Sequence, residues 1–432
     1  MDKRTFLKNF SLLSMATLPG VSALSNIVEE YEHIPPSALA TDEDFWATIR
    51  KGYRINPEYI NLENGYYCMM PEETLTNYVQ HVKDVNYQAS HYMRTVMAQN
   101  QTEVRKRLAE IAGCNADELI LTRNTTESLD LVIGGYKWEE GDEAIMARQD
   151  YGAMRNMFRL VKERYGVISK RISLPNHPES DEEILALYAE KITEKTKLIL
   201  ISHIVNINGQ VLPVKKICDM AHERGVEVMV DGAHAFAQLD FKIPDLNCDY
   251  YGTSLHKWLS APLGAGFLYV KKENIEKLWP LMAENVMPID NIDRLGHTGT
   301  KPVHVDLGIA NAIDYHNIIG SKRKEERLRF LKDYWTSKVK GIPNITVNSP
   351  WETERSCAIA NVSIKSMSPN KMAKILMDTY KIWTVAINRP NVRGCRITPN
   401  VFTTTKELDT FVRALTDMAS RVQEAPTALP VK

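Results

Sequence analysis

Apolar strand patterns alternate with amphipathic helix patterns through the middle of the chain. The strands are predicted at 119–122, 143–147, 166–172, 197–202, 227–231 and 266–270, and helices begin between them near Thr126, Met154, Asp181 and Val214. These strands are too apolar to have a solvent-facing side. We therefore expect an α/β fold with a mostly parallel sheet between helices. Ligands of such sheets bind beyond the carboxyl ends of the strands.

The pattern differs on either side of this region. Before it, a short helix is predicted at 42–51, a strand entering a glycine loop at 59–70, and amphipathic helices at 72–88 and 99–111. After it come a long helical region at 306–339, strands at 345–347, 358–364, 383–387 and 396–398, and helices at 370–380 and 405–422. The mixture predicts a smaller α+β domain. The predicted divisions are an arm at 24–58, a large domain at 59–305 and a small C-terminal domain at 306–432.

The stretch 248–270, CDYYGTSLHKWLSAPLGAGFLYV, has the most distinctive organisation. It predicts a strand, a polar loop with Ser254, His256 and Lys257, and a second apolar strand. Desolvation at the mouth of a sheet disfavours the charged form of a lysine, and an uncharged lysine is a nucleophile. Such a lysine can form a covalent imine with a carbonyl cofactor such as pyridoxal phosphate (PLP). The alternative is a solvated surface lysine.

Two other strand ends carry polar groups. In LTRNTTES, Thr125 or Thr126 at a helix start offers a hydroxyl and free backbone N–H groups, which suit an anion, although an ordinary helix cap gives the same pattern. In VMVDGAH, Asp231 ends a buried strand, where its carboxylate could hold a proton on a pyridine nitrogen. His234 could hydrogen-bond a phenolic oxygen. Capping of a following helix by Asp231 is the alternative.

Three further segments add candidate ligands. Asn206, in SHIVNINGQVLPV, could bind the same phenolic oxygen, and Tyr151, in QDYGA, could lie on a heterocycle or be an exposed loop tyrosine. Near the C-terminus, GCRIT places Arg396 on a short strand, where its guanidinium could grip a substrate carboxylate. Arg393 is the competitor for that role.

Taken together, VDGAH and HKWLSAPLGAGFL, supported by SHIVNINGQVLPV, RNTTES and QDYGA, resemble the class V aminotransferase family of fold-type I PLP enzymes. Among its members the chain is similar to isopenicillin N epimerase-like proteins. The resemblance covers roughly residues 59–409. It implies a large PLP-binding domain, a smaller C-terminal domain, pyridoxal 5'-phosphate as cofactor and a homodimeric active unit.

The resemblance also implies roles for residues around the cofactor ring. Lys257 matches the Schiff-base lysine, and Asp231 matches the partner of the pyridinium nitrogen. His234 and Asn206 stand at positions that approach the phenolic oxygen. Tyr151 stands where the family places a residue stacked on the ring.

Other positions match the family's phosphate and substrate sites. The residues at phosphate-cradle positions are Thr125, Thr126, Ser254 and His256. Thr300, in HTGT, resembles a residue that reaches the phosphate of the neighbouring subunit. Arg396 matches the arginine that receives the substrate carboxylate, and we expect Asn64 and Tyr66 to contribute to side-chain specificity.

The reaction expected is transamination or epimerisation at the α-carbon of an amino acid. A PLP-dependent lyase, kynureninase-like or acting on C–S bonds, ranks second. A cysteine desulfurase ranks lower because the one cysteine between Trp383 and Arg396 is Cys395, directly before the arginine. A binding protein that keeps the fold without turnover is an alternative from another class. A nicotinamide-binding enzyme would require a GxGxxG motif after an early strand, which this sequence lacks.

Composition agrees with a small-molecule enzyme. The chain has 432 residues and a net charge of -1, so no basic field favours nucleic acid. Its six cysteines include no CxxC pair, which indicates neither a metal site nor a disulfide framework. No apolar run reaches the roughly 18 residues of a membrane span.

The N-terminus has the layout of a signal peptide. Residues 1–23 run from a basic start at Lys3 and Arg4 through a weakly apolar stretch to small residues. KRTFLK resembles a twin-arginine export signal with Lys3 in place of the first arginine. We expect an exported, periplasmic protein. An amphipathic N-terminal helix is the alternative, and the protein would then be cytoplasmic.

Overall fold

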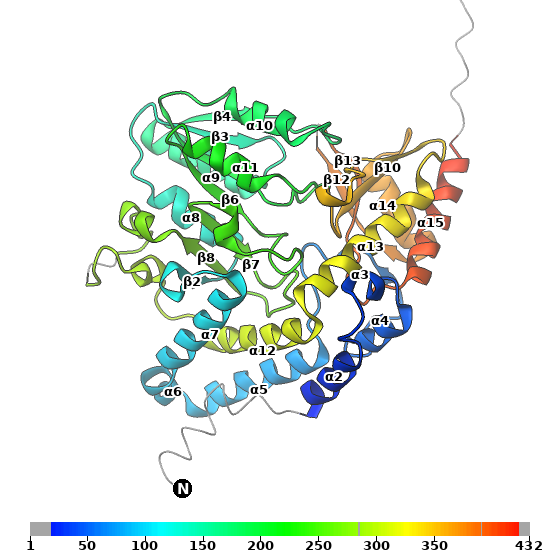
Figure 1. Cartoon of the computed structure of the whole chain (residues 1–432), viewed down its shortest axis with the longest axis horizontal. Coiled ribbons are helices and arrows are strands. Elements are labelled where there is room, and N and C mark those ends of the chain that lie inside the picture. The colour runs from blue at the N-terminus through cyan, green and yellow to red at the C-terminus, as the bar shows by residue number, and fades with distance from the viewer. Residues whose placement is uncertain (1–18, 284–285, 390, 423–432) are drawn as a thin grey trace, which may run out of the picture.

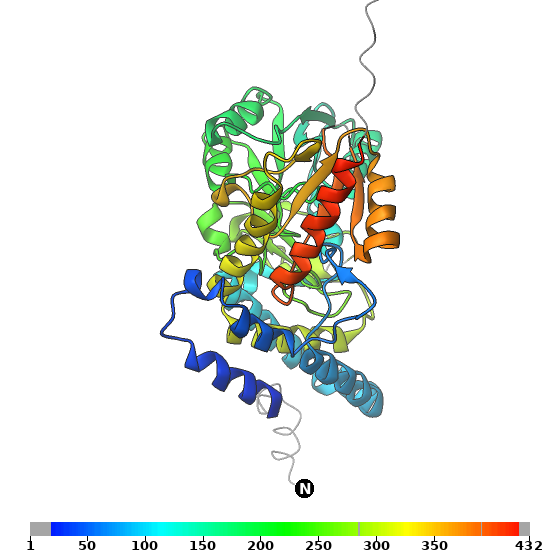
Figure 2. The same cartoon turned by 90° about the vertical axis from the view of Figure 1, so that its right-hand side faces the viewer.

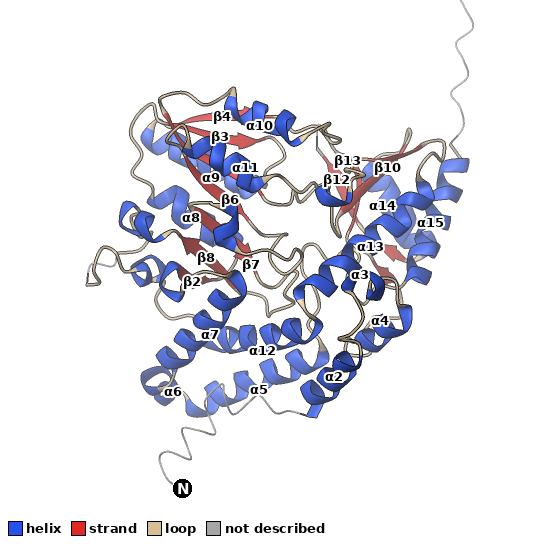
Figure 3. Cartoon of the chain, viewed as in Figure 1, coloured by secondary structure: helices blue, strands red, loops and turns tan. Residues whose placement is uncertain are grey.

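A seven-stranded sheet forms the centre of the large domain (Figure 1, Figure 3). The computed structural model describes residues 19–283, 286–389 and 391–422. In spatial order the strands are β2 (Leu119–Thr122), β8 (Gly266–Val270), β7 (Tyr250–Ser254), β6 (Glu227–Asp231), β5 (Thr196–Ser202), β3 (Glu143–Ala147) and β4 (Ile168–Ile172). β8 runs in the direction opposite to that of the other six strands. The mostly parallel sheet predicted from the sequence is confirmed.

Helices cover both faces of this sheet, as its apolar strands require. Helices α8 (Thr125–Gly135) and α9 (Gly152–Tyr165) pack on one face, and α10 (Asp181–Ala189) and α11 (Val214–His222) pack on the other. Consecutive strand residues point to opposite faces. Accordingly, Met146 shares one buried cluster with Phe158 of α9, while Ile145 belongs to the cluster that contains Ile217 of α11.

A helical layer lies along one edge of the large domain. It consists of α5 (Glu72–Gln88), α6 (Ser90–Thr95), α7 (Met97–Ala112) and α12 (Val303–Ile319), with α12 packed on α5 and α7. The long helical region expected at 306–339 is helical, but it consists of two helices. It is divided into α12 and α13 (Ser321–Val339) at Gly320, whose φ of 88° is left-handed and ends the first helix.

The small domain is built on an antiparallel sheet ordered β12 (Val385–Asn388), β13 (Arg393–Ile397), β10 (Ala360–Ile364) and β9 (Ile345–Val347). Helices α13, α14 (Pro369–Tyr380) and α15 (Thr405–Ser420) pack with it. The strand expected at 383–387 is two strands. β11 (Ile382–Trp383) pairs with β1 (Ile60–Asn61), whereas β12 pairs with β13.

The N-terminal arm packs along the molecule (Figure 2). It contains α2 (Pro19–Glu30), α3 (Pro36–Leu39) and α4 (Glu43–Arg50), and Phe45, Trp46 and Ile49 of α4 are buried. Most of the predicted signal at 1–23 lies outside the described residues and stays a prediction. Within the described part of the chain, no helix combines the length and apolar character needed to cross a membrane.

Candidate active site

A cavity of about 370 Å³ opens at the carboxyl ends of β5, β6 and β7, beside the small domain. Its size suits a cofactor with a small substrate. All the predicted site residues except Asn64 and Thr300 line it, namely Tyr66, Thr125, Thr126, Tyr151, Asn206, Asp231, His234, Ser254, His256, Lys257 and Arg396. The structure thus brings residues from separate strand ends and from the small domain to one place.

An anion cradle lies at one end of this cavity, where α8 begins. The Oγ atom of Ser254 lies 2.9 Å from the backbone N–H of Thr125 and 2.7 Å from its Oγ1. The cap of α8 is neither threonine but Asn124, whose side chain accepts from the N–H of Glu127. Free N–H groups and the positive end of a helix favour a phosphate. Because Asn124 has the capping role, neither threonine is needed as the cap, and Thr125 is bonded instead to Ser254 within the cradle.

Lys257 lies on the turn that follows β7, with its Nζ 3.3 Å from Nε2 of His234. Burial lowers the pKa of Lys257 to about 8, and the positive charge of Arg396 acts in the same direction. The negative charges of Asp231 and Glu63 oppose this shift. Roughly a tenth of this amine is therefore uncharged at pH 7, far more than for an ordinary lysine, and the uncharged amine is the nucleophile.

Asp231 is the buried carboxylate of the site. Burial raises its pKa, while the hydrogen bond that Oδ1 accepts from the N–H of Ala233 (3.0 Å) and the charge of Lys257 lower it. The predicted alternative, a helix cap, is wrong because a turn rather than a helix follows β6. A Cβ at Gly232 would lie 2.0 Å from the ring of Tyr251, so the residue after Asp231 has to be glycine.

Burial and a hydrogen bond from Trp258 determine the protonation state of His234. Burial lowers the pKa of His234 well below its usual value, so the imidazole is neutral. Its Nδ1 accepts from the indole N–H of Trp258 at 3.3 Å. An indole can only donate, so Nδ1 is unprotonated and Nε2 carries the hydrogen that faces Lys257. An ammonium cannot accept this hydrogen, and the contact therefore requires the uncharged amine.

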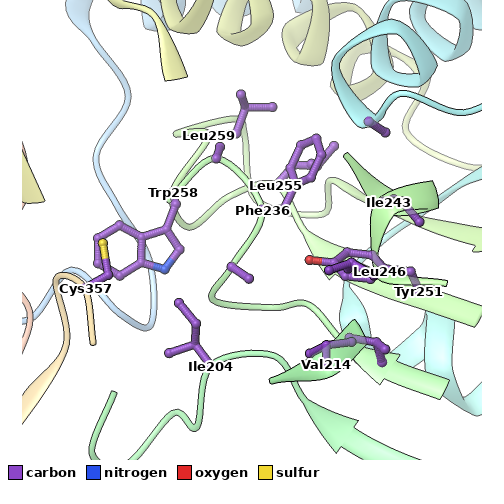
Figure 4. Packing of buried hydrophobic residues seen from close by; sticks show 14 of the residues in the cluster. Ile204, Val214, Phe236, Ile243, Leu246, Tyr251, Leu255, Trp258, Leu259 and Cys357 are labelled. Atoms are coloured by element: carbon purple, nitrogen blue, oxygen red, sulfur yellow. The ribbon is translucent and has the colours of Figure 1, made fainter. Parts of the chain in front are cut away.

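Trp258 was not among the predicted site residues. Its indole is buried in the large hydrophobic cluster (Figure 4), and behind it the buried Lys324 donates to its backbone carbonyl. The only sequence signal was its position directly after Lys257. A sequence pattern cannot show that the indole turns back to the histidine.

Arg396 is buried and already oriented by a carboxylate that the sequence analysis missed. Its Nε and Nη2 lie 3.2 Å and 2.5 Å from the two carboxylate oxygens of Glu63, and Nη1 donates to the carbonyl of Asn206 at 3.0 Å. A guanidinium has five N–H groups. These bonds leave one N–H group on Nη1 and one on Nη2, and two N–H groups can bind the two oxygens of a carboxylate. Arg393, the alternative, is exposed at the end of β13.

Two predicted residues lie elsewhere. Asn64 is fully buried behind the cavity, where its N–H and Nδ2 bind Oγ1 and the carbonyl of Thr398 at 2.7 Å and 2.8 Å. It therefore positions the loop that carries Tyr66. Thr300 lines a separate cavity with Met93 and Asp293. Its expected contact with a neighbouring subunit stays a prediction.

The fold and this cavity define a fold-type I PLP-dependent enzyme, because an anion cradle, a buried carboxylate and a buried lysine amine converge at the strand ends. The chain belongs to the aminotransferase class-V family, whose family model matches residues 68–414. Its cofactor is accordingly pyridoxal phosphate. The α8 end and Ser254 would hold the phosphate, Asp231 the ring nitrogen and Lys257 the aldehyde carbon.

Known relatives differ in the reaction they catalyse. The chain is 27% identical over 390 residues to isopenicillin N epimerase of Streptomyces clavuligerus, which covers 86% of this chain and 97% of that protein. It is 27% identical over 319 residues to a probable cysteine desulfurase of Halalkalibacterium halodurans, covering 70% and 76%. Among solved structures, the cysteine desulfurase of Thermococcus onnurineus aligns with a TM-score of 0.78 and 20% identity over 87% of this chain and 98% of that one.

Proposed function

We propose that this protein acts at the α-carbon of an amino acid as a PLP-dependent transaminase or epimerase, with Lys257 as the covalent and proton-transferring residue. The observation that carries the proposal is the buried amine of Lys257, with its pKa lowered to about 8, beside His234 and within the electrostatic influence of Asp231 and Arg396. The high coverage of the epimerase relative supports it.

When bound, PLP supplies an electron sink for the bond broken at the α-carbon. Lys257 would take the α-proton as its free amine, since its lowered pKa makes it a base near neutral pH. Asp231 would hold a proton on the ring nitrogen, and Nε2–H of His234 would donate to the phenolic oxygen. Arg396, aligned by Glu63, would fix the α-carboxylate.

A carbon–sulfur or related lyase is the second candidate. It is favoured by the fold shared with a cystine C–S lyase, with a TM-score of 0.76, 19% identity and coverage of 84% of this chain and 98% of that one. Desulfuration through a persulfide is less well supported. Cys395 is fully buried within β13, and burial raises the pKa of its thiol to about 12.

The test combines a spectrum with product analysis. The purified protein should absorb in the range typical of lysine-bound PLP, and Lys257→Ala should lose or shift this band. Lys324→Met is the matched control, because Lys324 is also buried but faces the carbonyl of Trp258. A protein that PLP cannot reconstitute would refute the proposal.

The reaction type follows from substrates incubated in deuterated water. Deuterium at the α-carbon with inversion indicates epimerisation, keto acid formed with transfer of nitrogen to the cofactor indicates transamination, and release of a β-substituent indicates a lyase. The last outcome would replace the first candidate by the second.

We further propose a homodimer in which Thr300 reaches the partner's cofactor, and export through the N-terminal signal. Light scattering of the purified protein tests the first, with a monomer at working concentration as the contrary result. N-terminal sequencing of protein from the periplasmic and cytoplasmic fractions tests the second.

A further inference from the structure

Three arginines from different elements lie close enough to influence one another electrostatically, near the residue that follows Tyr151 of the cavity lining. Arg155 lies in the first turn of α9, Arg171 on β4, and Arg389 directly after β12. A Cβ added at Gly152 would lie 3.8 Å from Nη2 of Arg155 and 4.0 Å from Nη2 of Arg389, so these two guanidinium groups are neighbours. The pKa of Arg155 is lowered by burial and by the positive charges of Arg389 and Arg171. The three cations therefore form one positively charged cluster.

The cluster lacks the carboxylate partners that several other arginines of the chain have. Arg327 is paired with Glu43, and Arg50 with Glu407. Within the described residues, no ion pair or side-chain hydrogen bond engages Arg155, Arg171 or Arg389, and the buried Nε of Arg155 has no acceptor. The nearby carboxyl of Asp150 binds Ser202 (2.8 Å), and burial raises its pKa to about 7. The positive charge of the three arginines is thus only partly neutralised by neighbouring carboxylates.

The backbone adds to this field. Helix α9 begins at Gly152 with Tyr151 at the cap, whose side chain satisfies no backbone N–H, and its first turn contains no acidic residue. The positive end of a helix with unsatisfied N–H groups attracts an anion. Tyr151 itself lines the cavity. Gly152, next to which Arg155 and Arg389 lie, directly follows Tyr151, so the arginine cluster lies near the cavity, outside its immediate lining.

The hairpin of β12 and β13 relates the cluster to Arg396. Val385 pairs with Arg396, and Arg389 stands four residues further along, which is about 13 Å of strand. The hairpin is fixed on the large domain because Asn391 binds Ser173 and its carbonyl accepts from Asn176 at 2.8 Å. Two anion-binding points thus lie at a set separation, and long arginine side chains can shorten the gap between them.

We propose that Arg155, Arg389 and Arg171 form a second anion subsite, and that the substrate is an amino acid whose side chain ends in a carboxylate. Arg396 would take the α-carboxylate, and the cluster would take the distal one by charge-assisted hydrogen bonds. This inference rests on the proposed action on an amino acid.

Binding of paired amino acids to the PLP-loaded protein tests the subsite. The dicarboxylates are aspartate, glutamate, 2-aminoadipate and 2-aminopimelate, and the neutral counterparts are norvaline and norleucine, with the cofactor band as readout. We expect the longer dicarboxylates to bind at least tenfold more tightly than the neutral ones. Arg155→Gln and Arg389→Gln should each weaken binding of the longer dicarboxylates by roughly tenfold or more. Neither variant should alter the affinity for norleucine. Arg159→Gln, one turn further along α9 and exposed, removes the same charge and should change neither.

The outcomes separate the two proposals. If the wild-type protein binds norleucine with the same affinity as every dicarboxylate, the subsite is refuted and the proposed function is unaffected. If no amino acid perturbs the cofactor band, the proposed function fails. The subsite is then judged by calorimetric titration with pimelate, which has no amine. Pimelate binding that Arg155→Gln and Arg389→Gln weaken, and Arg159→Gln does not, supports the subsite, and equal or absent binding refutes it.

Discussion

The cofactor half and the substrate half of this cavity are assembled differently. In the cofactor half, Ser202 and Asp231 are register partners on β5 and β6, and Asp231 is opposite Gly252 on β7, so one sheet sets their positions. In the substrate half, Glu63 and Arg396 meet although 333 positions separate them in the chain. The first half depends on a sheet, whereas the second depends on a loop and a domain held together.

This difference has an energetic consequence. Groups at the ends of parallel strands are held by a ladder of backbone hydrogen bonds that does not involve their side chains. Conservative substitution there should change chemistry and leave folding largely intact. The Glu63–Arg396 pair is both a part of the site and a buried contact between distant segments. Substitution there should change binding and stability together.

The largest effect is expected for Asp231→Asn. The amide can still accept from the N–H of Ala233, but it cannot stabilise a proton on the ring nitrogen. We expect turnover to fall by roughly 10²- to 10⁴-fold with little change in unfolding free energy. Asp150→Asn is the control, since Asp150 is buried nearby and bonded to Ser202 but does not line the cavity. Turnover within tenfold of wild type in Asp231→Asn would contradict the assigned role.

A pH profile tests the cofactor half next. Raising the pH removes the proton from Lys257, whose pKa is lowered to about 8 by burial. Capture of PLP by the cofactor-free protein should therefore accelerate up to about pH 8 and then level off. At pH 8 the uncharged fraction is roughly 100-fold that of an ordinary lysine with a pKa of about 10.4.

Stopped-flow absorbance measures this capture, with a free alkylamine as the reference for titration of PLP itself. Asp231→Asn should lower the midpoint, because the charge of Asp231 raises the pKa of Lys257. A protein whose capture rate rises in parallel with the free amine up to pH 10 would show that Lys257 is solvated.

The same contrast explains what the sequence could and could not predict. Strand ends are visible as polar residues after apolar runs, so Asp231, Lys257 and Thr125 could be found one element at a time and joined by the rule for parallel sheets. Glu63 could not, because its partner belongs to another domain and no local pattern distinguishes it from a loop carboxylate. Asn64, its neighbour, was predicted instead. The break at Gly320 was missed because both flanking helices have continuous helical patterns.

Glu63→Gln addresses the substrate half and should have an intermediate effect. Loss of the buried charge leaves Arg396 uncompensated and less well oriented. We expect amino-acid binding to weaken about tenfold and the unfolding free energy to fall by about 3 kcal/mol. Spectral titration and urea unfolding measure the two quantities.

An exposed pair provides the control for this variant. Glu273 lies 2.9 Å from Lys271 with its side chain 60% exposed, so Glu273→Gln should cost less than about 1 kcal/mol and leave binding unchanged. If Glu63→Gln instead binds amino acids more tightly, Glu63 competes with the substrate carboxylate and does not align Arg396.

Trp258→Phe should have the smallest effect, and it tests whether the indole N–H sets the tautomer of His234. Without the indole N–H, Nδ1 of His234 is free to carry the proton, and Nε2 then becomes an acceptor facing Lys257. We expect PLP affinity to fall about fivefold, the equivalent of one hydrogen bond. The substitution also changes packing, because Trp258 is fully buried.

His234→Gln separates these causes, since its amide presents N–H donors without a tautomer to be fixed. If Trp258 acts through the imidazole, Trp258→Phe should cost much less in the His234→Gln background than in the wild type. Equal costs in both backgrounds would assign Trp258 to packing alone. The position of the proton on His234 would then be set by the sheet and by Lys257, and Trp258 in the core would not contribute to it.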